Sequence, residues 1–238
     1  MSSVDVSAHA GAPGSKTFPK IELRVHLEGT VRARALLEIA KRNSVPLPAD
    51  SVEGLAGLYE YRDFAQFIEV WRLTTAALRT ERDFRQVVVD YAAEAASHGA
   101  VYVEGIFTPA ESAGRGYDWD EVFAGYCDGA QQAAEQHGVQ VRLTPDIPRG
   151  YPLEMAELTA QHAVAYRDRG VVGIGLGGPE AEYPPEAFAG RSRSPEIAGL
   201  DRCRTLARQR ARSRSAVRST PCVRTGSGTA SGRPTTLA

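Results

Sequence analysis

A small set of polar residues follows the apolar runs of the sequence, where parallel α/β folds place their reactive groups. His26 and Glu28 close the first of these runs, and Gly178 follows the fourth. A histidine at such a place can bind a metal or transfer a proton, and a carboxylate can accept hydrogen bonds from a ligand. Each residue also has an ordinary structural alternative: a hydrogen-bonded core histidine, an acid that favours a helix N-terminus, and a turn glycine.

Arg24 precedes His26 by two residues, so a strand would point both side chains to the same side. A guanidinium is permanently cationic and offers no lone pair, so Arg24 is not a metal ligand. Three other histidines fit structural places. His98 and His137 each precede a glycine at a predicted helix end, and we expect His162 on the surface of a helix.

The elements that would position these residues follow a β/α repeat, in which predicted helices end in a glycine that leads directly into a strand. The predicted strands are Ile21–Leu27, Val101–Phe107, Val139–Leu143 and Val171–Leu176. The helices predicted between the first two strands are Arg32–Arg42, Phe64–Leu78 and Glu81–Ser97. Strands separated by helices pair in parallel. The sequence therefore predicts an α/β fold of about four βα units, either a small open sheet or half of an eight-stranded barrel.

The chain of 238 residues divides into two unlike parts. Residues 191–238 hold 11 Arg, two acidic residues and no aromatic residue, a net charge of +9, whereas residues 1–190 carry −10. Apolar side chains are too few in the second part to offset a chain entropy of roughly 1–2 kcal/mol per residue. We expect a flexible N-terminus over 1–18, a folded unit over 19–190 and a disordered Arg-rich tail over 191–238.

Two function classes are disfavoured by composition. The sequence has no run of about 18–20 apolar residues and no apolar signal core near its start, so we expect a cytoplasmic protein without a membrane partner. The three cysteines lack CxxC spacing, which argues against a disulfide framework and against a thiolate metal site. We expect Cys127 to be a buried apolar residue.

The segment PKIELRVHLEGT, residues 19–30, resembles the opening strand of the adenosine deaminase family, where P-K-x-E-L-H-x-H-L-x-G is typical. Tyr102-Val103-Glu104, Thr108-Pro109 and the sequence GLGGPE at 175–180 extend the resemblance over roughly residues 19–190. They are most like the branch of adenosine and aminodeoxyfutalosine deaminases. The resemblance implies a TIM barrel, of which this chain holds the first half, and zinc-dependent hydrolytic removal of the 6-amino group of adenosine or a related purine nucleoside.

The resemblance also implies roles for single residues. His26 matches a zinc ligand, while Arg24 occupies the position of its partner ligand. Glu28 matches the residue that contacts the nucleoside sugar. Gly178 matches the glycine whose backbone N–H meets the purine, where a Cβ would obstruct the flat ring. Pro179 stands where adenosine-specific members carry Asp, so the exact nucleoside stays open.

The family's other zinc ligands and its catalytic Glu and His belong to a His-Ala-Gly-Glu motif and to later strands. No such motif appears after residue 180. Catalytic zinc requires about three protein ligands, so we expect that this chain holds no catalytic residue, does not bind zinc and is inactive.

The missing motifs reappear when the tail is written in another reading frame. Asp201–Arg208, as GAT CGG TGC CGC ACG CTG GCG AGA, reads Ser-Val-Pro-His-Ala-Gly-Glu when started two bases later. In the same shifted frame, Val223–Ala230 can read Ala-Asp-Arg-Ile-Arg-His-Gly, which resembles the family's sixth strand. We therefore expect a frame slip between Phe188 and Asp201 and an early termination.

A second function class is a non-catalytic interaction protein whose basic tail contacts RNA or DNA through phosphates. A solvated tail without a nucleic-acid partner is the favoured interpretation of the same charges. The half-barrel would also leave open sheet edges, which favour self-association or a partner chain.

Overall fold

The computed structural model describes residues 18–178 and the backbone of residues 201–202. The strands and helices in chain order are β1 (Lys20–His26), η1 (Leu27–Thr30), α1 (Ala33–Arg42), α2 (Val52–Ala56), η2 (Gly57–Tyr59), α3 (Phe64–Ala77), α4 (Glu81–Ser97), β2 (Ala100–Phe107), α5 (Pro109–Ala113), α6 (Trp119–His137), β3 (Gln140–Pro148), α7 (Leu153–Ala165), η3 (Arg167–Arg169), β4 (Gly173–Gly177) and β5 (Asp201–Arg202).

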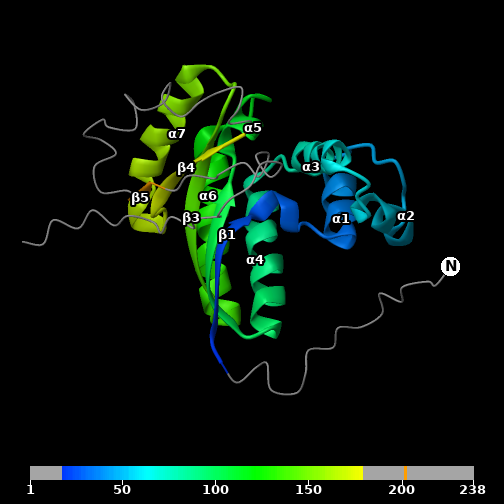
Figure 1. Cartoon of the computed structure of the whole chain (residues 1–238), viewed down its shortest axis with the longest axis horizontal. Helices are drawn as coiled ribbons and strands as arrows, with labels where there is room; N and C mark the ends of the chain where they lie inside the picture. The colour runs from blue at the N-terminus through cyan, green and yellow to red at the C-terminus, as the bar shows by residue number, and fades with distance from the viewer. Residues whose placement is uncertain (1–17, 179–200, 203–238) are drawn as a thin grey trace, which may run out of the picture.

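The strands pair in parallel in the order β1-β2-β3-β4-β5, and helices connect β1 to β2, β2 to β3 and β3 to β4 (Figure 1). This arrangement confirms the predicted α/β class and the partial barrel of four βα units. The short strand β5 pairs with β4. The rest of 191–238, and with it the predicted disorder of the tail, lies outside the described residues, as do residues 1–17 of the flexible N-terminus predicted over 1–18.

The core lies between the sheet and the long helices α4 and α6, which run side by side along one face of the sheet (Figure 1). Phe107 of β2 stacks on Tyr126 of α6, with ring centroids 4.3 Å apart. Alternate strand residues face this core: Val103 and Phe107 on β2, and Val141 and Leu143 on β3. The residues between them consequently face the interior of the incomplete barrel.

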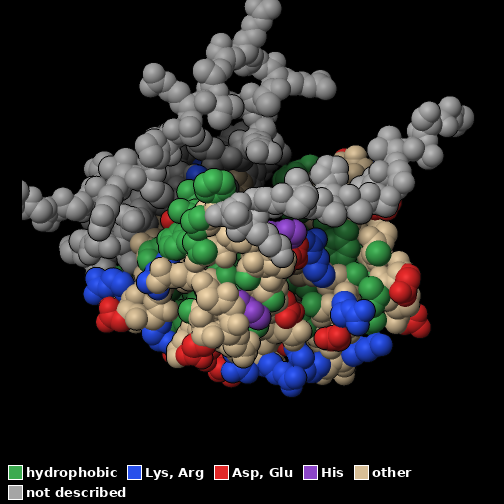
Figure 2. Space-filling model, turned by 90° about the horizontal axis from the view of Figure 1, so that it is seen from below, with side chains coloured by type: hydrophobic (Ala, Val, Ile, Leu, Met, Phe, Trp, Pro, Cys, Tyr) green, Lys and Arg blue, Asp and Glu red, His purple; other side chains and the backbone are tan. Residues whose placement is uncertain are grey.

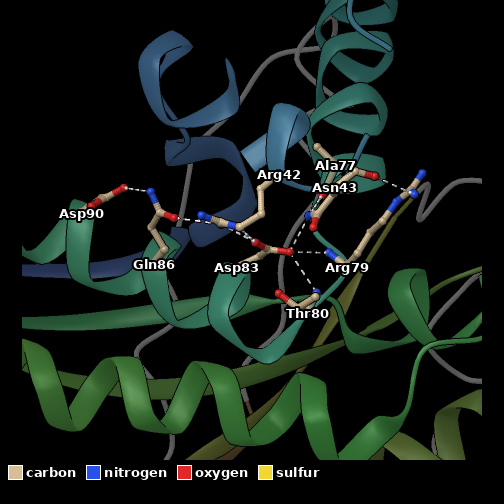
Figure 3. Close-up of polar contacts among 8 residues, drawn as sticks. All are labelled: Arg42, Asn43, Ala77, Arg79, Thr80, Asp83, Gln86 and Asp90. Carbon is tan, nitrogen blue, oxygen red and sulfur yellow. Dashed lines mark hydrogen bonds and ion pairs between the residues drawn. The ribbon is translucent and has the colours of Figure 1, made fainter. Parts of the chain in front are cut away.

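A buried aspartate ties the helices next to β1 together (Figure 3). Asp83, which is fully buried, accepts hydrogen bonds from the Arg42 guanidinium, from Asn43 Nδ2 at 2.6 Å and from the backbone N–H groups of Arg79 at 3.0 Å and Thr80 at 2.9 Å. Asp83 and Thr80 also form the capping box that begins α4. These bonds fix the end of α1 and the turn between α3 and α4.

The sequence predicted purely structural roles for four residues, and the structure describes all of them: His98, Cys127, His137 and His162. His98 caps the C-terminus of α4, His137 is the last residue of α6, and Cys127 is buried, as predicted. His162 is not a surface residue, because only 20% of its side chain is exposed. Its ring stacks on Trp119, with centroids 5.2 Å apart, since α7 packs on α6 there.

The face in Figure 2 shows acidic and basic side chains interspersed over the described surface. Such mixing gives no single-sign field on that face. Among the described helices, none combines the length and the apolar character needed to cross a bilayer.

Candidate functional site

The carboxyl ends of β1 to β4 place four residues in one layer on the interior face of the half-barrel. His26 pairs with Ile106, and Phe107 pairs with Pro145. Glu28 follows His26 by two residues, Thr108 and Asp146 come directly after Phe107 and Pro145, and Asp146 pairs with Gly175 on β4. The parallel register therefore brings Glu28, Thr108, Asp146 and Gly175 to the same height at the mouth of the half-barrel.

Glu28 lies in η1, directly after β1, and is only 4% exposed. Its Oε1 accepts a hydrogen bond from the backbone N–H of Thr108 at 2.6 Å. Burial raises the pKa of Glu28 to about 7, and the Thr108 hydrogen bond opposes this change. A carboxyl group held in this way can donate or accept a hydrogen bond near neutral pH.

His26 ends β1 beside the same layer and is exposed. Desolvation lowers its pKa, and the positive charge of Arg24 lowers it further. The imidazole is therefore held neutral, which is the form that binds metals.

Arg24 lies in an irregular part of β1, where the register with β2 shifts between Glu22 and Val25. Its backbone φ of 63° lies in the left-handed region, which a non-glycine residue adopts at a cost. One extra residue of β1 therefore stands opposite β2 here, as in a β-bulge.

Zinc does not fit the described residues. Arg24 has no lone pair for a metal, and its charge repels a cation from His26. The part of the chain that the structure describes contains no cluster of three or more His, Cys, Asp or Glu residues able to hold a metal ion. His26 alone provides one ligand, whereas a zinc site requires about four.

Gly178 directly follows β4, at the same end of the sheet as Glu28. Its φ of 101° is one that residues with a Cβ rarely adopt, and a Cβ there would lie 3.1 Å from Cβ of Arg149. Gly178 is also exposed, as a contact between its N–H and a ring would require.

A small cavity lies beside Glu28 and Gly29 and is lined mainly by side chains of α3 and the segment before it. The aromatic residues of this lining are Tyr59, Tyr61, Phe67 and Trp71. Tyr61 meets Phe67 edge to face, with centroids 5.3 Å apart. The free space of this cavity is only about 210 Å³, open solvent included, whereas pockets for small ligands are typically ~300–1,000 Å³, so the cavity by itself does not hold a nucleoside.

The sequence interpretation missed Asp146 and Arg149, which are 2% and 4% exposed at the end of β3. A signal for Asp146 was present, since the segment Thr144–Pro148 follows a strand in the way that Glu28 does. The two prolines of that segment instead indicated a loop.

The fold is that of the first half of an α/β barrel, and the candidate residues lie at the carboxyl ends of its strands. Comparisons with known proteins identify the family. A family model described as adenosine deaminase matches residues 19–202. The chain belongs to the adenosine deaminase family, as the resemblance in sequence implied.

Curated relatives support the same family assignment. The chain is 52% identical over 174 residues to an aminodeoxyfutalosine deaminase of Acidothermus cellulolyticus, covering 73% of this chain and 49% of the relative. It is 36% identical over 171 residues to an adenine deaminase of Cupriavidus necator, covering 72% and 48%. The chain thus spans about half the length of the curated relatives it matches.

Solved structures share the fold. An adenine deaminase from Arthrobacter aurescens aligns with a TM-score of 0.68 at 28% identity, covering 78% of this chain and 57% of that one. An amidohydrolase from Burkholderia ambifaria with bound Zn aligns with a TM-score of 0.70 at 26% identity, covering 80% and 52%. Zinc is therefore a cofactor within the family, although the described residues of this chain do not fit it.

Proposed function

We propose that the described residues form the substrate-binding, N-terminal half of a deaminase barrel for a 6-aminopurine nucleoside in the cytoplasm. Aminodeoxyfutalosine-type nucleosides are the first substrate class to consider, because the relative of that activity is 52% identical. The observation that carries the proposal is the buried carboxyl group of Glu28 at the mouth of the half-barrel.

Hydrolytic deamination joins a water oxygen to C6 of the purine and breaks the C6–N bond, so that ammonia leaves. In the proposed complex, Glu28 accepts a hydrogen bond from a sugar hydroxyl, and the Gly178 N–H donates one to a ring nitrogen. The aromatic side chains that line the small cavity beside Glu28 give this side of the site an apolar surface. These residues bind and orient a nucleoside, and none of them activates water.

We therefore propose that the chain binds purine nucleosides without converting them. No step runs through zinc, because Arg24 stands in a ligand position and His26 is a lone ligand among the described residues. The predicted frame slip would account for an incomplete site, but its residues lie outside the described part of the chain, apart from the backbone of 201–202.

The proposal is tested by titrating the full chain with adenosine in a calorimeter and by measuring ammonia release with zinc supplied. We expect adenosine to bind, Glu28→Gln to weaken this binding about tenfold through the loss of a charged hydrogen bond, and ammonia to stay at the metal-free blank. Glu53→Gln, on the exposed N-terminal turn of α2, is the matched control. Failure of the wild-type chain to bind adenosine would refute the binding role, and ammonia above the blank would refute the inactivity.

A further inference from the structure

Asp146 is buried on the interior face of the half-barrel, away from the apolar core. Successive side chains of a strand point to opposite faces. Val141 and Leu143 of the same strand face the core beneath α6, so Asp146, an odd number of residues further along, points into the barrel. Only 2% of its surface is exposed. The register places it beside Thr108, whose N–H holds Glu28, so Asp146 lies in the same layer as the proposed nucleoside site.

Strand β4 leaves space for this carboxyl group. Gly175 and Gly177 face the same interior, and both lack the side chain that would fill it. A Cβ on Gly175 would lie 1.7 Å from Asp146 Oδ1, and a Cβ on Gly177 would lie 2.6 Å from Oδ2. A side chain at position 175 or 177 cannot coexist with Asp146 in this position, so the carboxyl group and these two glycines form one feature.

The hydrogen bonds of Asp146 are incomplete. Among the described residues, its Oδ1 has no hydrogen-bond partner although it is buried. Asp83 shows how the same protein holds a structural aspartate, since both of its oxygens accept hydrogen bonds from the surrounding helices and turn (Figure 3). A buried polar atom without a partner is costly, and such atoms occur at functional sites.

The charges around Asp146 come from three elements. Burial raises its pKa to about 7, the charge of Glu28 raises it further, and the charges of Arg24 and Arg149 oppose the change. The carboxyl group thus changes protonation near neutral pH, where it can accept a hydrogen bond or donate one. Amino groups and hydroxyls of a nucleoside are partners for both forms.

We propose that Asp146 is a substrate-contacting, specificity-determining residue whose unpartnered Oδ1 hydrogen-bonds an N–H or O–H group of the purine nucleoside. This inference rests on the proposed nucleoside-binding function and adds a residue that sequence reasoning did not select. The hydrogen-bond donor belongs either to the amino group of the base or to a hydroxyl of the sugar.

The test compares Asp146→Ala and Asp146→Asn with the wild-type full chain by calorimetry, with adenine and adenosine as the two probes. We expect Asp146→Ala to weaken adenosine binding about tenfold or more, the usual effect of losing a hydrogen bond to a charged group. A parallel loss for adenine assigns the contact to the base, and a loss for adenosine alone assigns it to the sugar. Asp90→Asn, on α4 outside the layer, should leave both affinities unchanged.

A second measurement separates a ligand contact from a structural role. If Asp146 serves the ligand, then Asp146→Ala and Asp146→Asn keep the wild-type melting temperature at pH 8 or raise it, because each removes a buried, incompletely bonded carboxyl group. Asp83→Ala, in contrast, should lower the melting temperature by several degrees.

Each outcome decides the proposal. A loss of stability in both Asp146 variants as large as that of Asp83→Ala overturns it, and so does unchanged binding of both probes in a chain that binds adenosine. If the wild-type chain binds neither probe, the proposed function and this inference fall together.

Discussion

At the scale of single residues, the protein contains two buried aspartates with opposite surroundings. Asp83 accepts hydrogen bonds from Arg42, Asn43 and two backbone N–H groups, whereas Asp146 lies against bare glycines with one oxygen unpartnered. Burial raises the pKa of both groups. Only for Asp83 do the hydrogen bonds outweigh burial, so that its pKa falls below the usual 3.8.

Replacement of Asp83 should therefore cost stability in a pH-dependent way. A depressed pKa means that the ionised form stabilises the folded state above the unfolded pKa, and that this contribution is lost as pH falls through the folded pKa. We expect Asp83→Ala to lower the free energy of unfolding at pH 7 by on the order of 2–4 kcal/mol, since it leaves Arg42 and two N–H groups without their acceptor.

Urea unfolding at pH 7 and at pH 3 measures this effect. The difference between wild type and Asp83→Ala should shrink at the lower pH, and Asp50→Ala at an exposed position should change neither value. An effect of Asp83→Ala that is equal at both pH values would contradict the role of the ionised carboxylate.

Arg24 offers a direct test of the metal argument. Arg24→His places two imidazoles two residues apart on β1 and removes the charge that repels a cation. Histidine tolerates the left-handed backbone of this position better than most residues do. We expect the variant to bind zinc at least about tenfold more tightly than wild type, as measured by competition with a chromogenic chelator.

The matched control for this experiment is Arg34→His, which adds a histidine on the exposed side of α1 and should leave zinc affinity unchanged. Wild-type protein that retains one equivalent of zinc after dialysis would contradict the interpretation that Arg24 and a lone His26 do not hold the metal.

At the scale of elements, α4 and α6 approach closely because α6 carries glycines where it crosses α4. A Cβ on Gly125 would lie 2.5 Å from the backbone oxygen of Glu81 and 2.8 Å from Cβ of Phe84. A backbone atom cannot move aside without displacing its helix. The glycine therefore sets the distance between the two helices that cover the sheet.

Gly125→Ala should destabilise the fold by about 1–3 kcal/mol through overpacking, even though alanine is the better helix former by about 1 kcal/mol. Thermal unfolding followed by circular dichroism measures the change. Gly57→Ala is the control, because a Cβ there meets nothing within 4 Å and its φ is −62°. An unchanged melting temperature in Gly125→Ala would show that α4 and α6 separate without cost.

The elements were predictable where the sequence is periodic and became less so at their ends. Helix α4 was predicted over Glu81–Ser97 and is found there. Strand β3 was predicted to end at Leu143 but continues to Pro148, since Pro145 lies beside β2 despite lacking an N–H. This extension carries Asp146 into the site layer, so the same error in β3 concealed a candidate residue.

The site was predictable only through a motif. His26 and Glu28 were selected because the residues around them match a family pattern, and the structure places them beside one another at the mouth of the half-barrel. Asp146 belongs to no such pattern, and it is a candidate because it is buried against Gly175 and Gly177, which have no side chains. These properties depend on the register of β3 with β4, which no local sequence signal specifies.

At the scale of the whole molecule, β1 forms an edge of the described sheet, because it pairs only with β2 there. Apolar side chains on and before this strand are exposed: Phe18 by 77%, Ile21 by 64% and Leu23 by 59%. An edge strand with exposed apolar residues is a template for pairing with a second chain.

We therefore expect the chain to self-associate through β1 as its concentration rises. Ile21→Lys should shift the equilibrium toward monomer, because a lysine ammonium loses hydration when a second chain covers the edge. Sedimentation velocity over a concentration series measures the distribution of masses, and Leu153→Lys, which adds the same charge on an exposed apolar residue of α7, is the control. If both variants dissociate the protein equally, net charge rather than the β1 edge governs association, and a wild-type chain that stays monomeric at all concentrations would show that the exposed strand does not recruit a partner copy.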